Sequence, residues 1–298
     1  MARILVATPT LSNCLDALGV HELVAGAPGS DANAEVLICD PTQVVDLAAI
    51  QRMPALRLIA VAGTGSDAID HDATRSRSIA TTTAGNVLAE TTADIAFGLI
   101  ISASRLMHDA ETTLRSGSWE GWQFVEPFGQ DVHGATLGLI GFGAIGQAVA
   151  RRAQGFQMTI LHHTRHPTGR GGWIEDLDEL LKKSDVVSLH LPLHSETLHL
   201  LDRRRIALLK PTAVLINTSR GAVVDEDALA DALFAGELFA AGLDVYENEP
   251  KVSARLLRAP RTVLLPHIGS ATRKTREAML RSAAQKVAAF LEQPEALS

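Results

Sequence analysis

The feature that most constrains the fold of this chain is a glycine-rich string between a strand pattern and a helix pattern. The strand candidate TLGLI runs into GFGAIG (Gly141 to Gly146), and the helix pattern AIGQAVARRA follows at once. Gly141 makes the tight turn, Gly143 lets backbone approach a pyrophosphate, and Gly146 lets helix and strand pack closely. The helix N-terminus then offers free N–H groups to phosphate. The string predicts a dinucleotide-binding βαβ unit.

Short apolar runs alternate with helical patterns along the chain of 298 residues, which predicts two α/β domains with parallel sheets. The first series of strands is expected at residues 4–7, 36–39, 58–61 and 79–81, followed by a long helix over 90–105. The second series is expected at residues 136–141, 159–162, 186–191, 213–217, 239–243 and 263–265, with helices at 145–154, 177–183, 204–209 and 226–235.

The last helix, residues 273–291, has no obvious place in the second sheet. We expect it to cross back to the first domain. The predicted division is therefore a discontinuous substrate domain, residues 1–100 and 269–298, and a dinucleotide-binding domain, residues 101–268. A polar, Trp-bearing stretch over 117–134 lies near the start of the second domain.

Composition argues against several classes of partner. A net charge of −7 offers no basic footprint for nucleic acid. No apolar run reaches the roughly 20 residues of a membrane span, and the longest candidate, residues 93–103, is better interpreted as a buried helix. The N-terminus lacks a signal-peptide pattern, and Cys14 and Cys39 make no disulfide framework. We expect a cytoplasmic protein with neither nucleic acid nor membrane as partner.

Three segments near the end of the chain carry catalytic chemistry: NTSRG (217–221), LDVYENEP (243–250) and LLPHIGSAT (264–272). Arg220 can grip a carboxylate through its planar fork. His267 is the side-chain type best suited to deliver a proton near neutral pH.

A carboxylate beside His267 would favour its charged form. Glu249 lies directly before a proline in the second segment, but Asp244 and Glu247 compete with it on spacing alone. Together these groups are what the reduction of a 2-keto acid by hydride transfer requires.

The strand end TILHHTRH indicates which dinucleotide is used. Sheets that bind NAD place an acid about 20 residues past the fingerprint to hold the ribose 2′-hydroxyl. Here Thr164 and Arg165 occupy that place, and no carboxylate is near. They could bind a 2′-phosphate instead, so we expect NADP(H) to be preferred over NAD(H). The alternative is that Arg165 is a solvated loop residue.

Metal binding deserves consideration because His162, His163 and His166 lie together. Adjacent histidines on a strand point to opposite faces of the sheet, so the pair is a poor chelate. We expect no metal site.

With these motifs the sequence resembles the D-isomer-specific 2-hydroxyacid dehydrogenases over nearly its whole length. The resemblance implies two similar α/β domains with the active site in the cleft between them, usually assembled as a homodimer through the cofactor domain. The segments that carry it are VAGTGSDAID (61–70), NVLAETTADIAFGLIISASR (86–105), RSGSWEGW (115–122), HGATLGLIGFGAIGQAVARRA (133–153), SDVVSLHLPL (184–193), INTSRGAVVDEDAL (216–229), GLDVYENEP (242–250) and LLPHIGSAT (264–272).

The resemblance also implies roles for single residues. Arg220 corresponds to the substrate-binding arginine, His267 to the acid/base, and Glu249 to the partner of that histidine. The backbone N–H groups of Thr64 and Gly65 correspond to a cradle for the substrate carboxylate. Asp244 corresponds to the residue that holds the nicotinamide carboxamide. The remaining cofactor contacts implied are Thr91, Gly141, Gly143, Ala144, Ile145, Gly146, Thr164, Arg165, Thr218, Ser219 and Gly269.

Within this family the basic strand end is most similar to that of glyoxylate/hydroxypyruvate reductases. It implies reduction of a small 2-keto acid to the D-2-hydroxy acid. One alternative is an NAD-linked dehydrogenase of a larger D-2-hydroxy acid or of phosphoglycerate, although no basic cluster lies beside Thr64 in the sequence. Another is a nucleotide-sensing corepressor, a class that uses this fold and can keep all three catalytic residues.

Overall fold

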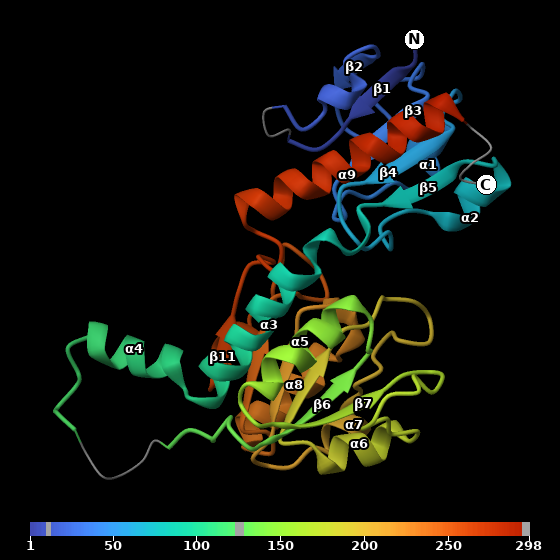
Figure 1. Cartoon of the computed structure of the whole chain (residues 1–298). Coiled ribbons are helices and arrows are strands. Elements are labelled where there is room, and N and C mark those ends of the chain that lie inside the picture. The colour runs from blue at the N-terminus through green and yellow to red at the C-terminus, as the bar shows by residue number, and fades with distance from the viewer. Residues whose placement is uncertain (10–12, 123–127, 294–298) are drawn as a thin grey trace. The chain divides into compact units, whose positions relative to one another are not determined.

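A computed structural model describes residues 1–9, 13–122 and 128–293, and the chain forms two compact units. Unit 1 comprises residues 1–88 and 270–298, and unit 2 comprises residues 89–269. Figure 1 follows the chain from blue at the N-terminus to red at the C-terminus. Both units contain a parallel sheet with helices, so the predicted fold class is confirmed.

The first predicted domain boundary is wrong, because α3 (Ala89–Ser104) belongs to unit 2 rather than to the substrate domain. Its apolar face packs against α5 (Ala144–Gln154) and against strands β9 (Val214–Asn217) and β10 (Ala240–Leu243). Burial of that face decides which unit the helix joins. The second boundary differs by one residue, since Gly269 also lies in unit 2.

Unit 1 is built on a five-stranded sheet in the order β2-β1-β3-β4-β5 with every neighbouring pair parallel. Helix α9 crosses back to this sheet and packs against β4 and β5, while α1 and α2 lie close to each other. The elements are β1 (Arg3–Val6), η1 (Asp16–Leu18), β2 (Glu22–Ala25), β3 (Val36–Cys39), α1 (Leu47–Gln51), β4 (Leu58–Val61), α2 (His71–Ser76), β5 (Ala80–Thr83), η2 (Gly85–Leu88) and α9 (Arg273–Glu292).

Strand β2 was missed by the sequence reasoning. It lies at the edge of the sheet, pairs only with β1, and has no buried residue. It therefore lacks the continuous apolar run that identified the other four strands.

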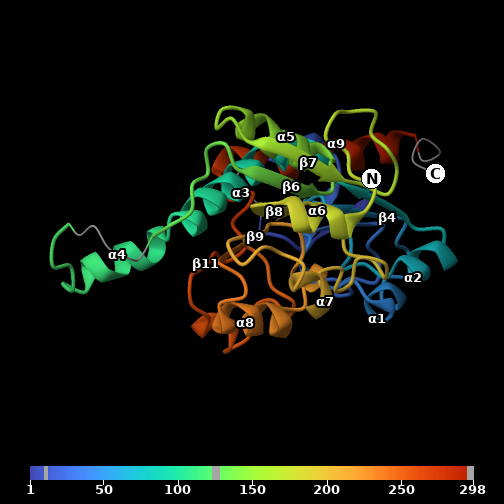
Figure 2. The same ribbon diagram turned by 90° about the horizontal axis from the view of Figure 1, so that it is seen from below.

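Unit 2 is built on a six-stranded parallel sheet in the order β11-β10-β9-β8-β6-β7. Helices α3 and α5 contribute to the core on one face, and α6, α7 and α8 contribute to the core on the other; Figure 2 shows α5 and α8 on opposite sides of the strands. The remaining elements are α4 (Met107–Arg115), β6 (Thr136–Ile140), β7 (Thr159–His163), α6 (Leu177–Lys183), β8 (Val186–Leu189), α7 (Arg203–Ile206), η3 (Gly221–Val223), α8 (Glu226–Ala235), η4 (Leu256–Arg258) and β11 (Thr262–Leu264).

Within the described ranges, one stretch meets the length and composition of a membrane span, namely residues 85–104, which is longer than the apolar run expected from the sequence. However, 56% of its most apolar window is buried inside the protein. The α3 part packs on α5, β9 and β10 of its own unit. With this much of its surface buried, the stretch has the character of a core helix.

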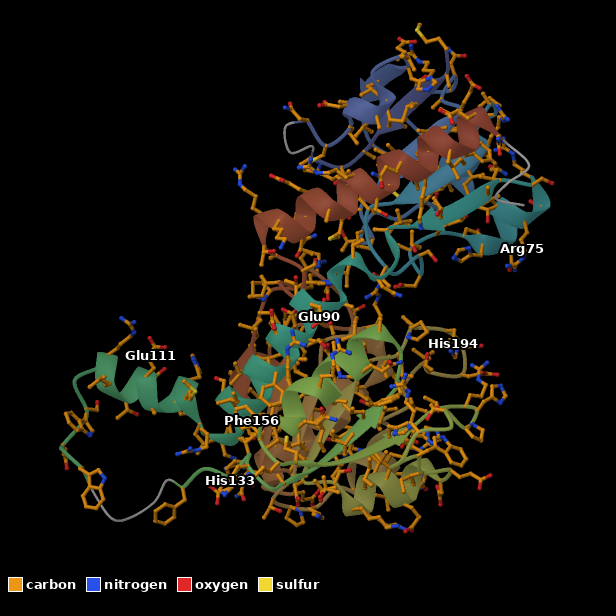
Figure 3. The ribbon with its side chains drawn as sticks, viewed as in Figure 1. Arg75, Glu90, Glu111, His133, Phe156 and His194 are labelled. Atoms are coloured by element: carbon orange, nitrogen blue, oxygen red, sulfur yellow. The ribbon has the colours of Figure 1, made fainter. Side chains whose placement is uncertain are left out.

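Helix α4 and the segment after it form an arm that stands away from the sheet of unit 2 in both views (Figures 1 and 2). Leu106 adopts a left-handed backbone, φ 51°, and separates α4 from α3. No residue of α4 is buried, and Glu111 lies out on this arm in Figure 3. Part of the Trp-bearing stretch, residues 123–127, lies outside the described residues.

Candidate active site

The three segments predicted to carry catalysis follow neighbouring strands of unit 2. Arg220 follows β9, Glu249 follows β10, and His267 follows β11. These strands are parallel neighbours, so their carboxyl ends meet at one edge of the sheet. Ligands of such sheets bind outside that edge.

Glu249 and His267 form a direct pair. Nδ1 of His267 lies 2.8 Å from Oε2 of Glu249, and the other carboxylate oxygen accepts the N–H of Tyr246 at 3.0 Å. The two side chains are only 32% and 27% exposed. Burial raises the pKa of Glu249, but the bonds from His267 and Tyr246 outweigh it and bring that pKa below its usual value. Glu249 is therefore an anion at neutral pH, and the ring's Nε2 has no protein partner among the described residues.

The backbone around His267 is also fixed. His267 adopts a left-handed conformation, φ 54°, which is uncommon for a residue other than glycine. Its N–H donates to the carbonyl oxygen of Asp244 at 2.9 Å. The hydroxyl of Tyr246 donates to the carbonyl oxygen of Leu265 at 2.9 Å. These bonds tie the segment after β11 to the segment after β10.

The two rival carboxylates have other partners. Asp244 is 1% exposed, and its side-chain oxygens accept the N–H groups of Ile268 and Gly269, each at 2.7 Å. Burial raises the pKa of Asp244. Glu247 pairs with His199 at 2.8 Å. Of the three candidates left open by the sequence, Glu249 is the one bonded to His267.

Arg220 lies against the segment that bears Glu249. Asn217 stabilises its turn: the amide Nδ2 donates to the carbonyl oxygen of Arg220 at 2.9 Å, and Oδ1 accepts the N–H of Ser219 at 3.0 Å. A Cβ on Gly221 would lie 1.9 Å from the carbonyl carbon of Tyr246, so only glycine allows this approach. The Arg220 charge contributes to lowering the pKa of Glu249.

The glycines of the fingerprint have the environments that a dinucleotide site requires. Gly141 adopts φ 93°, and a Cβ there would lie 2.3 Å from the carbonyl oxygen of His190. A Cβ on Gly146 would lie 2.4 Å from the carbonyl oxygen of Gly141. Nothing lies within 4 Å of the same position on Gly143, which caps α5. That open approach leads to the N–H groups at Ala144 and Ile145.

A buried polar atom directly after β9, at the same edge of the sheet as the fingerprint, also fits a ligand. The Oγ1 of Thr218 is buried and has no hydrogen-bond partner in the described part of the chain, whereas buried hydroxyls are normally paired. Ser219, by contrast, donates its hydroxyl to Asn217 at 2.8 Å. Thr91 lies in the first turn of α3, within the same unit.

The strand end after β7 is more exposed. The hydroxyl of Thr164 donates to the carbonyl oxygen of His166 at 2.7 Å. The guanidinium of Arg165 pairs with Glu196 at 2.9 Å, and both side chains are about two-thirds exposed, 67% and 70%. Glu196 was missed because it lies far along the chain, and only the fold places a carboxylate beside Arg165.

The neighbouring histidines have roles within the protein. His162 is fully buried and stacks on Phe142, with ring centroids 3.9 Å apart and an interplanar angle of 17°. His163 contacts the carbonyl oxygen of Ile174 through Nδ1 at 3.1 Å. Across residues 1–9, 13–122 and 128–293, no group of three or more potential ligand side chains is arranged to hold a metal ion.

The predicted carboxylate cradle lies in unit 1, directly after β4. Thr64 donates its hydroxyl to the carbonyl oxygen of Gly85 at 2.8 Å. The N–H groups of Thr64 and Gly65 have no protein acceptor in the described ranges. Lys286 of α9 donates to the carbonyl oxygen of Thr83 at 2.7 Å, so the same unit does place a cation near this turn. The sequence analysis could not predict this cation, because Lys286 and Thr64 lie far apart in the chain.

Comparison with known proteins identifies the family. The profile described as "D-isomer specific 2-hydroxyacid dehydrogenase, NAD binding domain" matches residues 97–269. The glyoxylate reductase of Thermococcus litoralis is 42% identical over 265 residues, which cover 86% of this chain and 80% of that protein. This chain belongs to the D-isomer-specific 2-hydroxyacid dehydrogenases.

Two further members show how closely the chain follows the family. The glyoxylate/hydroxypyruvate reductase B of Escherichia fergusonii is 42% identical over 268 residues, with 88% of this chain and 82% of that protein covered. The structure of an NADPH-dependent glyoxylate/hydroxypyruvate reductase from Sinorhizobium meliloti, in complex with NADP and malonate, has a TM-score of 0.89 at 33% identity and covers 98% of this chain and 94% of that one. Unit 2 is therefore the nicotinamide-dinucleotide-binding part of a 2-hydroxyacid dehydrogenase.

Proposed function

We propose that this protein reduces small 2-keto acids, with glyoxylate and hydroxypyruvate as preferred substrates, to D-2-hydroxy acids. The observation that carries the proposal is the 2.8 Å bond between Glu249 and His267, on the sheet edge that also bears Arg220. The names of the relatives that are 42% identical support the choice of small substrates.

The nicotinamide, when bound, supplies the hydride that adds to the carbonyl carbon of the substrate. Arg220 binds the substrate and stabilises the negative charge that develops on the carbonyl oxygen. The N–H groups of Thr64 and Gly65 bind the substrate carboxylate. Nε2 of His267 donates a proton to the oxygen, while Glu249 holds Nδ1 and stabilises the charged ring before the proton leaves.

NADPH is the proposed cofactor. Position 164 carries no acid that would repel a 2′-phosphate, and Arg165 offers a guanidinium beside it. The solved relative from Sinorhizobium meliloti, an NADPH-dependent glyoxylate/hydroxypyruvate reductase, supports the same choice. The Arg165–Glu196 pair opposes it, because the phosphate must compete with a carboxylate for the guanidinium. We therefore expect a modest preference, about tenfold, at the lower end of what one charge-assisted hydrogen bond contributes.

A homodimer is the proposed assembly, with the arm around α4 docking on a second copy. The arm exposes several large apolar side chains, which cost free energy in water unless a partner covers them. Among them are Met107, Leu114, Trp119, Trp122 and Phe128, all more than half exposed. Sedimentation of the protein and of a Leu114→Asp, Trp119→Asp variant tests this: the wild type should be a dimer and the variant a monomer. A monomeric wild type contradicts the assembly.

The function is tested with a panel of 2-keto acids against NADPH and NADH. We expect kcat/KM to be higher for glyoxylate or hydroxypyruvate than for 3-phosphohydroxypyruvate. The segment around Thr64 contains no cation of its own to neutralise a phosphate, and the nearby Lys286 already donates to the carbonyl oxygen of Thr83. A preference for the phosphorylated acid would favour the phosphoglycerate alternative, and binding of NADPH without turnover of any acid would favour a corepressor.

A further inference from the structure

Helix α8 begins with a carboxylate that is buried rather than solvated. Glu226 is 7% exposed, although acidic side chains in the first turn of a helix usually face water. Asp225 already caps the helix by accepting the N–H of Ala228 at 2.9 Å, so Glu226 is not needed as the cap. The adjacent Asp227 is exposed, as expected for this position.

The partner of Glu226 lies in the segment that carries Glu249. Oε1 of Glu226 accepts the backbone N–H of Glu247 at 2.5 Å. Burial raises the pKa of Glu226, and the charges of Glu247, Asp227 and Glu249 add to that rise, while the Glu247 N–H opposes it. Burying a carboxylate among other acids costs free energy. We therefore asked what the bond between Glu226 and the Glu247 N–H contributes to the site.

A second contact fixes the same stretch of backbone. Gly221 packs so closely on Tyr246 and Glu247 that its Cβ would lie within 2.2 Å of both residues. The N–H of Tyr246 in turn holds Oε1 of Glu249, whose Oε2 holds His267. A continuous series of contacts thus joins the start of α8 to the proton donor.

We infer that Glu226 is a positioning residue for the Glu249–His267 pair: its buried carboxylate fixes the backbone from which Glu249 reaches His267. Glu226 touches neither substrate nor cofactor in this role, and it acts through Glu249. The kinetic test of this role, described next, rests on the proposed function. The NMR test that follows it rests on the geometry of the site alone.

Three variants distinguish the effect of the position of the Glu226 side-chain oxygen from the effect of its negative charge. Glu226→Gln keeps an oxygen at the same distance and removes the charge, so kcat should remain within about threefold of the wild type. Glu226→Asp keeps the charge but withdraws the oxygen from the Glu247 N–H, and kcat should fall about tenfold or more because small misplacements are costly in catalysis. Asp227→Asn, the matched control, loses an exposed charge in the same helical turn and should leave kcat unchanged.

A double-mutant cycle then asks whether the effect passes through Glu249. In a Glu249→Gln background, Glu226→Asp should lose most of its effect on kcat, because coupled residues are not additive. An undiminished effect in that background overturns the inference, as does a Glu226→Asp enzyme with wild-type kinetics. Thermal unfolding of each variant identifies losses that come from global instability.

An NMR measurement keeps the inference testable if no substrate is turned over. The ring signals of His267, assigned from their loss in His267→Ala, report its bond to Glu249. They should shift in Glu226→Asp and stay in place in Asp227→Asn and Glu226→Gln. Absence of turnover by the wild type contradicts the proposed function alone, whereas unchanged His267 signals in Glu226→Asp contradict the positioning role.

Discussion

The catalytic corner, defined by Arg220, Glu249 and His267, and the strand end at Thr164 and Arg165 were both predicted from sequence, yet they are built very differently. In the corner, the side chains of Glu249 and His267 are about two-thirds or more buried, and backbone bonds fix the segments that carry them. At the strand end, Arg165 is 67% exposed and its ion pair is with an equally exposed glutamate.

The difference fits the two tasks proposed for these regions, proton transfer at the catalytic corner and cofactor discrimination at the strand end. Proton transfer requires atoms that are held within hydrogen-bond distance of each other. The side chains that perform it are therefore expected to be buried and fixed by several contacts. Discrimination between cofactors depends on the balance of charges around one phosphate, which exposed side chains provide at lower strength because water and salt screen them. Substitutions should therefore cost far more in the corner than at the strand end.

The largest effect is expected from His267→Ala. Loss of the proton donor should reduce kcat for keto-acid reduction by about 10²–10⁴-fold, the usual contribution of a positioned general acid. The measurement is steady-state kinetics with glyoxylate and NADPH. His133→Ala, which removes an exposed histidine of the same unit, serves as the control and should have no effect. Comparable rates for the two variants would show that another group donates the proton.

Arg220→Lys should be next. The lysine keeps the charge but loses the planar fork, and loss of a charged hydrogen bond of about 1.5–3 kcal/mol corresponds to roughly 10- to 150-fold in kcat/KM. KM should rise and kcat should fall, while the dissociation constant of NADPH stays the same. Near wild-type kinetics in this variant would exclude Arg220 as the substrate clamp.

Glu249→Gln should be milder than His267→Ala and should appear mainly in the pH dependence. The charge that favours the imidazolium is removed, so the alkaline fall of the reduction rate should move to lower pH. Glu247→Gln, which disturbs the pair with His199, is the control and should leave that fall in place. A shift in the control alone would mean that the carboxylate has been misassigned.

Glu249→Gln should also change the pH dependence of the thermal stability. The pKa of Glu249 is lowered in the folded protein, so its pairing stabilises the fold fully above the unfolded pKa of about 4.3. That contribution is lost as pH falls through the lower folded-state pKa. The difference in Tm between wild type and Glu249→Gln should therefore be largest near pH 6 and shrink below pH of about 4.

At the strand end, Thr164→Asp combined with Arg165→Ala should invert the cofactor preference. The new carboxylate would repel the 2′-phosphate and accept from the ribose hydroxyls. The wild-type advantage of NADPH, about tenfold, should become an advantage of NADH. The ratio of kcat/KM for the two cofactors measures it. If the wild type uses NADH equally well or better, Arg165 is only a solvated loop residue.

The smallest effect is expected from Glu196→Gln. It frees Arg165 from its carboxylate, so the preference for NADPH should rise about 1.4- to fivefold, which corresponds to an exposed ion pair of about 0.2–1 kcal/mol. The gain should disappear in high salt. Glu175→Gln, an exposed acid of the same unit, is the control. A fall in NADPH preference would show that Glu196 assists the cofactor rather than competing with it.

Much of the fold followed from local patterns. The buried strands of both sheets and the long helices were predicted because their apolar periodicity is strong, and the crossing of α9 to unit 1 followed from its lack of a partner in unit 2. The edge strand β2 and the exposed helix α4 were missed because neither buries a continuous apolar face. The misplaced boundary at residue 100 has a related cause. The apolar pattern of α3 indicates that one face is buried, but it does not indicate which of the two sheets that face packs against.

Sequence alone determined which chemical groups this protein possesses, because a strand, a glycine fingerprint and the residues after strand ends are local properties of the chain. Only the tertiary structure decided which groups meet. It selected Glu249 over Asp244 and Glu247 as the partner of His267, and it brought Glu196 to Arg165. These outcomes depend on the spatial order of parallel strands and on the loops between them, which join residues far apart in the chain, and no spacing rule encodes those distances.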